Sequence, residues 1–258
     1  MRLKALVSIA AFLALWEALV DTGVLPHVIV PSPSDVIAFM LNAKNAATIA
    51  YNLAWTAARA TGGFAIGLCV GIGLGFLLSA RTLGDYLMPL ITAIFAVPSI
   101  AWIPILIVWV GLKPLELPMT ASFLCSFPPV LYGVMNAVRT MDVEQVGVAM
   151  ALGAKPATVM RRVVIPQTLV RIIPLIKTQA VVAWKSTFAA EMIALSTGLG
   201  ALAMTYATTL ETDGLIAVVA VLSAVTAAIV QGFDALERRY ARRWFGKAGK
   251  YPLPYAPL

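Results

Sequence analysis

Charged side chains are scarce in this sequence: only 12% of its 258 residues are Asp, Glu, Lys or Arg, whereas 60% are hydrophobic. Soluble domains are usually about half apolar and about a quarter charged, because polar side chains must cover a surface that faces water. This composition therefore excludes an ordinary water-soluble globule. It predicts an integral membrane protein.

Groups that commonly perform catalysis or hold metals are also sparse. His27 is the only histidine, and neither an H-E-x-x-H metal motif nor a G-x-x-x-x-G-K-[ST] phosphate loop occurs. The cysteines, Cys69 and Cys125, lie inside apolar runs and are interpreted as small buried hydrophobes, not as a disulfide. We expect no metal, nucleotide or other cofactor on this chain.

The net charge of +7 is concentrated between and beyond apolar runs. No stretch interleaves basic residues with exposed aromatics, so nucleic-acid binding is not expected. Basic residues accumulate in the cytoplasmic loops of membrane proteins. Placing the N-terminus in the cytoplasm puts Arg81, the segment 139–171 and the run 238–243 on that same side. Both termini are therefore predicted to be cytoplasmic.

Six apolar runs have the length of about 20 residues that a spanning helix needs. We expect an all-α integral membrane domain over 1–258, with a cytoplasmic connection over about 139–171 and a tail over 237–258. The N-terminal run has the basic-then-apolar order of a signal peptide, but it contains Glu17 and no clear small-x-small cleavage site, so it is interpreted as a retained span. The six predicted transmembrane helices lie near 4–20, 60–79, 87–110, 117–138, 174–194 and 214–233.

Glycine and proline mark three segments around the second and third predicted spans. Ser32-Pro-Ser-Asp35 fits a helix start with a reciprocal cap. The third span holds Pro89, Pro98 and Pro104, which suit either a helix that lines a pathway or an ordinary kinked helix.

In lipid, small residues let helix backbones approach one another. The second span is therefore predicted to pack through the glycines at every fourth position, Gly63, Gly67, Gly71 and Gly75.

The cytoplasmic connection contains the stretch ALGAKPATVMRRVVIP, from Ala151 to Pro166. Residues 142–152 suit a helix that Gly153 can end, because glycine readily adopts the left-handed conformation. Pro156 can open a second helix, and Pro166 is predicted to close it. The sequence therefore predicts a helix–glycine–helix element.

The second helix of this element is amphipathic. At about 100° per residue, one face gathers the apolar side chains and the other gathers Thr158, Arg161 and Arg162. Two interpretations are open from the residues: a helix lying on anionic lipid, or a docking element for a groove of a cytoplasmic protein. The apolar face consists of Val159, Met160, Val163 and Val164.

The fifth predicted span carries charges. Lys177, Trp184 and Glu191 are seven residues apart and share nearly one face, and Lys185 flanks that face near mid-depth. An unpaired charge at that depth costs at least about 2.5–3.5 kcal/mol. Trp184, Lys185 and Glu191 are predicted to line a pathway for an anion; alternatively a lysine pairs with a carboxylate on another helix, such as Glu17. Lys177 and Glu191 lie nearer the ends and can snorkel.

The connection resembles the "EAA" loop of permease subunits in ATP-binding cassette (ABC) importers. The register is Gly147-Val-Ala149, then Gly153, then Val163-Val-Ile165-Pro166, and Gly147 replaces the motif glutamate, with Glu144 one turn earlier. Other fragments resemble the nitrate, sulfonate and taurine branch of these permeases. They are Pro31-Ser-Pro-Ser34, Ala101-Trp-Ile-Pro104, Trp109-Val-Gly111, Ala190-Glu-Met192 and Gly198-Leu-Gly200.

The resemblance implies a permease in a bacterial inner membrane, with no ATPase activity of its own. Its expected partners are a second, identical permease subunit, two cytoplasmic ATPase subunits that hold ATP and magnesium, an external solute-binding protein and membrane lipid. The expected solute is a small anion such as nitrate, a sulfonate or taurine. The residues expected to couple the ATPase to the spans are Glu144, Gly147, Ala149, Leu152, Gly153, Ala154, Val159, Val163 and Pro166.

Two other classes of membrane protein compete with this interpretation. An intramembrane enzyme would need a catalytic set within the spans, such as paired aspartates, and none is evident. A secondary transporter would be expected to contain internal repeats, and none is obvious. Neither alternative would depend on an ATPase partner.

Overall fold

The computed structural model describes residues 2–27, 29–79, 81–141 and 143–245. All regular structure within those residues is helical. The predicted tail over 237–258 begins inside the last helix, and its part from 246 onward lies outside the described residues. The elements are α1 (Arg2–Asp21), α2 (Pro33–Leu41), α3 (Ala43–Leu78), α4 (Arg81–Ala96), the 3₁₀ helix η1 (Ser99–Trp102), α5 (Ile103–Val110), α6 (Glu116–Arg139), α7 (Val143–Ala151), α8 (Pro156–Val159), the π-helical turn η2 (Met160–Val164), α9 (Ile165–Ala194), α10 (Leu199–Thr209) and α11 (Thr212–Phe245).

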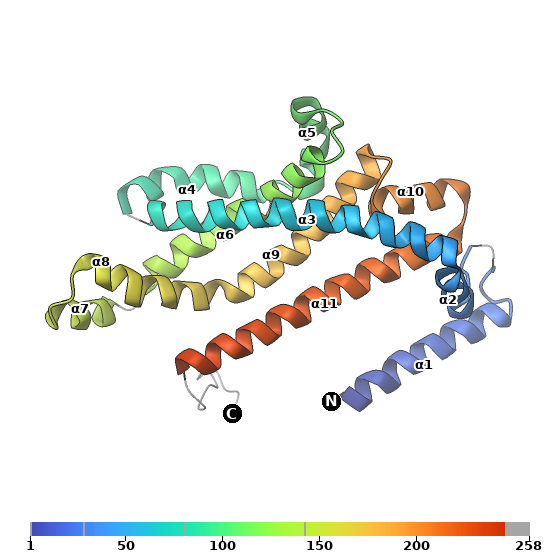
Figure 1. The fold of residues 1–258 in the computed structure, drawn as a ribbon, viewed down its shortest axis with the longest axis horizontal. Helices are drawn as coiled ribbons and strands as arrows, with labels where there is room; N and C mark the ends of the chain where they lie inside the picture. Colours follow the sequence, from blue (N-terminus) through green and yellow to red (C-terminus); the bar gives the residue numbers. More distant parts are fainter. Residues whose placement is uncertain (1, 28, 80, 142, 246–258) are drawn as a thin grey trace.

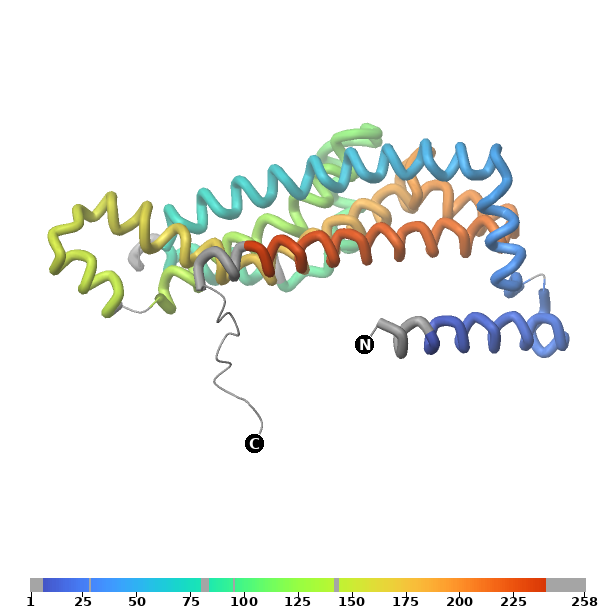
Figure 2. Tube along the Cα trace, turned by 60° about the horizontal axis from the view of Figure 1, so that its bottom comes forward, coloured from blue at the N-terminus to red at the C-terminus, as the bar shows by residue number. Residues whose placement is uncertain are grey.

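The long helices α3, α6, α9 and α11 run along an elongated bundle (Figure 1). Helices α7 and α8 form one end of this bundle, which we call the α7–α8 end. Helices α2 and α10 lie at the opposite, α2–α10 end. Helix α1 lies apart from the long helices and is joined to them through α2, as Figure 2 shows.

Within the described residues, three helices are long and apolar enough to cross a membrane: α3, α6 and α11. The number rises to five if each of two bent helix pairs counts as one span. One pair joins residues 156–194 to α10 with a bend of 48°, and the other joins α4 to η1–α5 with a bend of 88°. The third predicted span, 87–110, is therefore not one straight helix, because it breaks at Pro98. The total of six spans stays a prediction.

The four glycines of the predicted packing stripe are buried in α3, where they face α6. A Cβ atom on Gly71 would lie 2.9 Å from Val130 Cγ1, and one on Gly75 would lie 2.6 Å from Val134 Cβ. A Cβ on Gly63 or Gly67 would meet Ser122 or Ser126 in the same way. The facing residues on α6 also recur about every fourth position, so two matching stripes bring the backbones into close contact.

Helix α2 starts with the predicted reciprocal cap. Ser32 Oγ accepts from Asp35 N–H at 3.2 Å, and Ser32 N–H donates to Asp35 Oδ2 at 3.1 Å. The Ser32 hydroxyl bond holds the pKa of Asp35 below its ordinary value. The stabilisation that this cap contributes is therefore fully present at a pH above the ordinary pKa of an aspartate. It is lost as the pH falls through the lowered pKa of Asp35.

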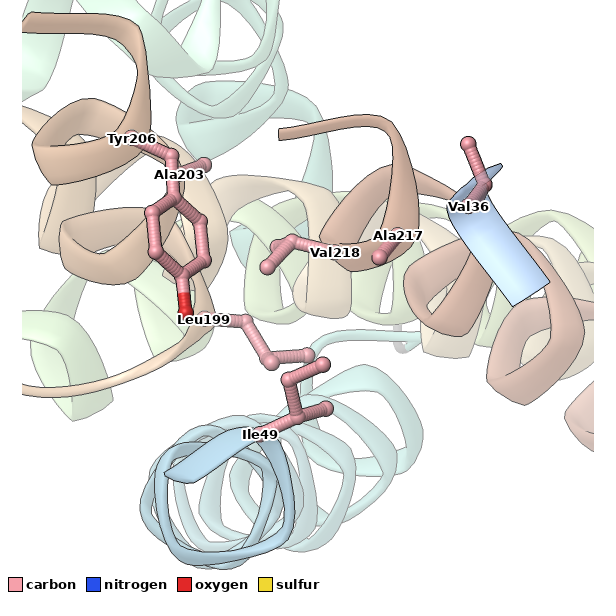
Figure 3. Close-up of a cluster of buried hydrophobic side chains, with 7 residues drawn as sticks. All are labelled: Val36, Ile49, Leu199, Ala203, Tyr206, Ala217 and Val218. Carbon is pink, nitrogen blue, oxygen red and sulfur yellow. The ribbon is translucent and has the colours of Figure 1, made fainter. Parts of the chain in front are cut away.

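A hydrophobic cluster holds the α2–α10 end together (Figure 3). Its side chains come from α2, α3, α10 and α11, so helices far apart in the sequence converge there. Phe39 of α2 packs edge-on against Tyr206 of α10, with ring centroids 5.7 Å apart. The buried members are Val36, Ile49, Leu199, Ala203, Tyr206, Ala217 and Val218.

The helix that follows Gly153 does not close at Pro166, and that prediction is wrong. Residues 156–194 form one continuous helical rod because a π-helical turn, Met160–Val164, joins α8 to α9. Within this turn Ile165 N–H donates to Met160 O, five residues back. The wider turn tolerates Pro166, which lacks the N–H that an α-helical ladder requires.

We predict that Gly71→Val lowers stability by about 1–3 kcal/mol, because the added atoms overpack the contact between α3 and α6. Gly73→Val is the matched control, since nothing lies within 4 Å of a Cβ atom at Gly73 on the same helix. Thermal unfolding of the detergent-purified variants measures the difference. Equal melting temperatures for the two variants would refute the packing role of the stripe.

Candidate functional site

A buried polar cluster joins α3, α9 and the start of α10. The side chains of Arg59 and Glu191 are both 0% exposed, and Arg59 Nη1 lies 2.8 Å from Glu191 Oε1. Arg59 also donates to the Thr197 carbonyl at 2.7 Å and to the Thr197 hydroxyl at 2.8 Å. Its guanidinium carbon lies 4.9 Å from the centroid of the Trp55 ring. The charge of Arg59 is therefore neutralised inside the protein.

The same cluster caps the N-terminus of α10, whose first amides have no partner within the helix. Gly198 N–H donates to Asn52 Oδ1 at 2.7 Å, and Leu199 N–H donates to Thr56 Oγ1 at 2.8 Å. Gly200 N–H donates to Glu191 Oε2 at 3.1 Å. Gly198 has a φ of 109°, and a Cβ atom there would overlap the Glu191 carboxylate, so only glycine fits. Side chains of α3 and α9 thus fix the turn into α10.

Arg59 was not predicted as a site residue, since it precedes the predicted second span by one position. Asn52, Thr56 and Arg59 do share a helical spacing of four and three residues. That spacing of polar residues on one face is the signal that could have indicated a buried cluster, because α3 begins well before residue 60.

Of the three predicted pathway residues, only Lys185 borders an open space. Trp184 is 6% exposed and Glu191 is fully enclosed by the cluster described above. Lys185 is exposed and lies in a groove of about 510 Å³ between α9 and α11. The remaining lining residues are Leu222, Ser223, Thr226, Ala227, Val230 and Gln231.

Lys177, in the half of α9 nearer the α7–α8 end, is paired, whereas Arg171 in the same half donates to the Thr140 carbonyl at 3.2 Å. Lys177 Nζ lies 2.7 Å from Asp234 Oδ1 and 3.7 Å from Glu237 Oε2, both on α11. Glu17, the expected carboxylate partner for a lysine, instead accepts from the Ser34 backbone at 3.1 Å and from its hydroxyl at 2.5 Å. Among the described residues Lys185 forms no ion pair.

Gly153 ends α7 in the left-handed conformation, with a φ of 83°, as predicted. Gly153 N–H donates to Met150 O at 2.9 Å, and Ala154 N–H donates to Ala149 O at 3.1 Å. These two bonds form a Schellman motif, which reverses the chain sharply. The helix–glycine–helix geometry that was expected of residues 142–166 is therefore present between α7 and α8.

The apolar face after Gly153 packs mostly against its own chain and is not free to dock. Val159 is 3% exposed, and Val164 is 7% exposed. They pack with Met141, and the predicted coupling residues Ala149, Ala154 and Val163 lie partly buried around them. Pro166 is half-buried in the first turn of α9.

The exposed surface of the α7–α8 end belongs to other residues of the same segment. Leu152 is 84% exposed, Glu144 and Gly147 are exposed on α7, and Arg161 and Arg162 are exposed on the π-helical turn. We call this surface the tip. Its exposed large apolar side chains are Val148, Met150, Leu152 and Met160.

The family described as "Binding-protein-dependent transport system inner membrane component" matches residues 67–245. The chain belongs to this family. It is a permease of an ABC importer, a transport subunit and not an enzyme. Permeases of this kind work with ATPase and solute-binding partners.

Named relatives cover almost the whole chain. It is 26% identical over 249 residues to the taurine transport system permease protein TauC of Escherichia coli, covering 93% of this chain and 89% of that protein. It is 26% identical over 244 residues to the putative aliphatic sulfonates transport permease protein SsuC of Bacillus subtilis, covering 94% and 87%. The fold is shared by a chain in the structure described as "Crystal structure of an amino acid ABC transporter with histidines". The TM-score is 0.67 and the sequence identity is 19%, and the match covers 78% of this chain and 98% of that chain.

We predict that Arg59→Met lowers the free energy of unfolding by about 3–5 kcal/mol, because it leaves the Glu191 carboxylate buried without a counter-charge. Asp85→Asn is the control, since its ion pair with Arg139 is exposed and worth at most about 1 kcal/mol. The double variant Arg59→Met/Glu191→Gln should recover much of the loss, because it removes both charges and keeps an acceptor for Gly200. Thermal unfolding in detergent measures all three, and an Arg59→Met variant as stable as Asp85→Asn would contradict the assignment.

Proposed function

We propose that this permease forms the translocation pathway for a small anionic solute of the sulfonate or taurine kind. An external solute-binding protein delivers the solute, and two cytoplasmic ATPase subunits, which hold the ATP and magnesium, drive its passage. A second copy of this chain completes the pathway. The observation that carries the anionic assignment is Lys185, which forms no ion pair among the described residues and lines the groove between α9 and α11.

An unpaired lysine in a membrane helix is costly, by at least about 2.5–3.5 kcal/mol at mid-depth. On the same helix, Lys177 forms an ion pair with α11 and Glu191 forms one with α3. These two charges are therefore neutralised by partners within the chain. Lys185 instead faces a groove whose other polar groups, Ser223, Thr226 and Gln231, are uncharged. A lysine in that position attracts an anion. The names of the taurine and sulfonate relatives support the same solute class.

The tip supplies the proposed contact with the ATPase. Leu152 and its apolar neighbours are exposed beside Arg161 and Arg162, which suits a groove with apolar walls and an acidic rim. This modifies the expected contact, since Val159 and Val163 support the tip from inside, whereas Leu152 and Met160 present the free surface.

The proposed orientation places the α7–α8 end and both chain termini in the cytoplasm. Arg161, Arg162 and Arg171 belong to this end, and Arg238 and Arg239 lie near the close of α11, which runs toward the same end (Figure 1). Basic residues favour the cytoplasmic side of a membrane. The outer face then contains α2, α10 and the capped turn between α9 and α10, where the solute-binding protein would dock.

We predict that Lys185→Met reduces uptake of ethanesulfonate about tenfold or more, because it removes the positive charge from the groove. The control is Lys113→Met, an exposed lysine in the turn between α5 and α6. Uptake is measured in proteoliposomes that contain the importer, its solute-binding protein and ATP. Unchanged uptake by Lys185→Met would reject the anionic pathway.

We predict that Leu152→Asp prevents the ATPase subunit from co-purifying with this chain, because a buried carboxylate cannot be accommodated in an apolar groove. Leu112→Asp is the matched control, since Leu112 is 63% exposed in the turn after α5, away from the tip. Quantitative pull-down from solubilised membranes compares the two. Retention of the ATPase by Leu152→Asp would exclude the tip as the coupling contact, and uptake without any ATPase would exclude the importer mechanism.

A further inference from the structure

The break between α4 and η1 opens a second, uncharged cleft. The helices on its two sides meet at 88°, and a cleft of about 320 Å³ lies between the break, α6 and α9. None of the described residues that line it is charged. Its side-chain polar groups come from Ser99, Cys125 and Gln179, and the indole of Trp102 forms part of the wall.

Two adjacent prolines make the α6 wall of this cleft rich in hydrogen-bond acceptors. Pro128 and Pro129 have no N–H, so neither can donate to the carbonyl four residues earlier. Those carbonyls belong to Leu124 and Cys125, and all four residues line the cleft. The carbonyl oxygens of Leu124 and Cys125, beside the cleft, therefore lack the hydrogen-bond donor that an α-helix normally provides.

Gln179 adds a third acceptor from α9. The residue is 7% exposed, and its Oε1 is buried with no hydrogen-bond partner among the described residues. Cys125, on the α6 wall of the cleft, is satisfied, because its Sγ donates to Ser186 Oγ at 3.1 Å and Ser186 Oγ donates to the Ala121 carbonyl at 3.3 Å. A buried amide oxygen that the chain itself leaves unpaired is suited to a donor that arrives with a ligand.

The cleft and the Lys185 groove both border α9, on faces about 120° apart. Gln179, Val182 and Lys185 are three residues apart, and each such step turns the face by about 60° and rises about 4.5 Å. Val182 lines the cleft, and Lys185 lies one such step beyond it. A solute that moves about 9 Å along α9 and partly around it can therefore meet an acceptor-rich wall and a positive charge in succession.

We propose that this cleft is a solute-contact site that binds the hydrogen-bond-donating end of the solute, an amine or amide N–H, through Gln179 and the two free carbonyls of α6. This assignment rests on the proposed translocation pathway and refines its solute class to small aminosulfonate-like molecules, which carry both an acidic group and an N–H donor. Lys185 selects the acidic group, and the cleft selects the donor.

The first test compares taurine with ethanesulfonate, which lacks the amine but is otherwise similar. In proteoliposomes with the complete importer, Gln179→Leu should raise the KM for taurine about tenfold, the factor that corresponds to one lost hydrogen bond, and should leave ethanesulfonate uptake unchanged. Gln179→Asn, which keeps an amide, should retain a larger share of the taurine preference. An equal effect of Gln179→Leu on both solutes, or no effect on either, would overturn the proposal.

The second test needs no knowledge of the solute, because the two cysteines report on water access. Cys125 lines the cleft, whereas Cys69 is exposed on α3 and lies outside the cleft lining. With Cys69→Ser as background, a membrane-impermeant cationic methanethiosulfonate should label Cys125 in membrane vesicles, and adding ATP with vanadate should change the rate. With Cys125→Ser as background, Cys69, which lies on the outer surface of the membrane-spanning helix α3, should stay unlabelled with and without nucleotide.

The two tests separate the failure of the cleft from the failure of the proposed function. If neither sulfonate is transported but Cys125 is labelled in a nucleotide-dependent way, the anionic solute class fails and the cleft remains part of the pathway. If uptake depends on Lys185 but Cys125 is unlabelled in both nucleotide states, the cleft is rejected and the anionic pathway stands.

Discussion

Inside a bilayer no water is available to pair with a charge or a backbone amide, so the protein must supply each partner itself. The pair of Arg59 and Glu191 shows how this constraint organises the chain. One carboxylate neutralises the guanidinium and accepts a hydrogen bond from the first turn of α10, so a single buried cluster fixes three helices and a sharp turn. Lys177 follows the same rule through α11. Lys185, which forms no ion pair among the described residues, and Gln179, whose Oε1 has no hydrogen-bond partner there, do not follow this rule.

Features that depend on local backbone chemistry were predictable from the sequence. The Ser32 cap, the left-handed Gly153 and a helix before it follow from short-range rules, and the structure has all three. The glycine stripe of the second span is also a local pattern, and the structure places it against α6. Family membership followed from several such local fragments in the right order, and the match over residues 67–245 confirms it.

Features that depend on tertiary pairing were not predictable. Arg59 lies next to the apolar run that indicated the second span, and only the position of Glu191 on another helix explains its burial. The break in the third span has the same origin: prolines indicate a weak point, but the neighbouring helices decide whether it bends by a few degrees or by 88°. Pro166 failed as a helix stop because a π-helical turn, which has no simple sequence signal, relieved its missing hydrogen bond.

The uninterrupted rod from Pro156 to Ala194 has a mechanical consequence. Glu191, which is anchored to α3, lies 35 residues beyond Pro156, and Lys185 lies six residues before Glu191. At about 1.5 Å per residue the two arms measure about 52 Å and about 9 Å. If the rod pivots at that anchor, the leverage is close to six to one. A large displacement at the α7–α8 end would then become a displacement about six times smaller beside Lys185.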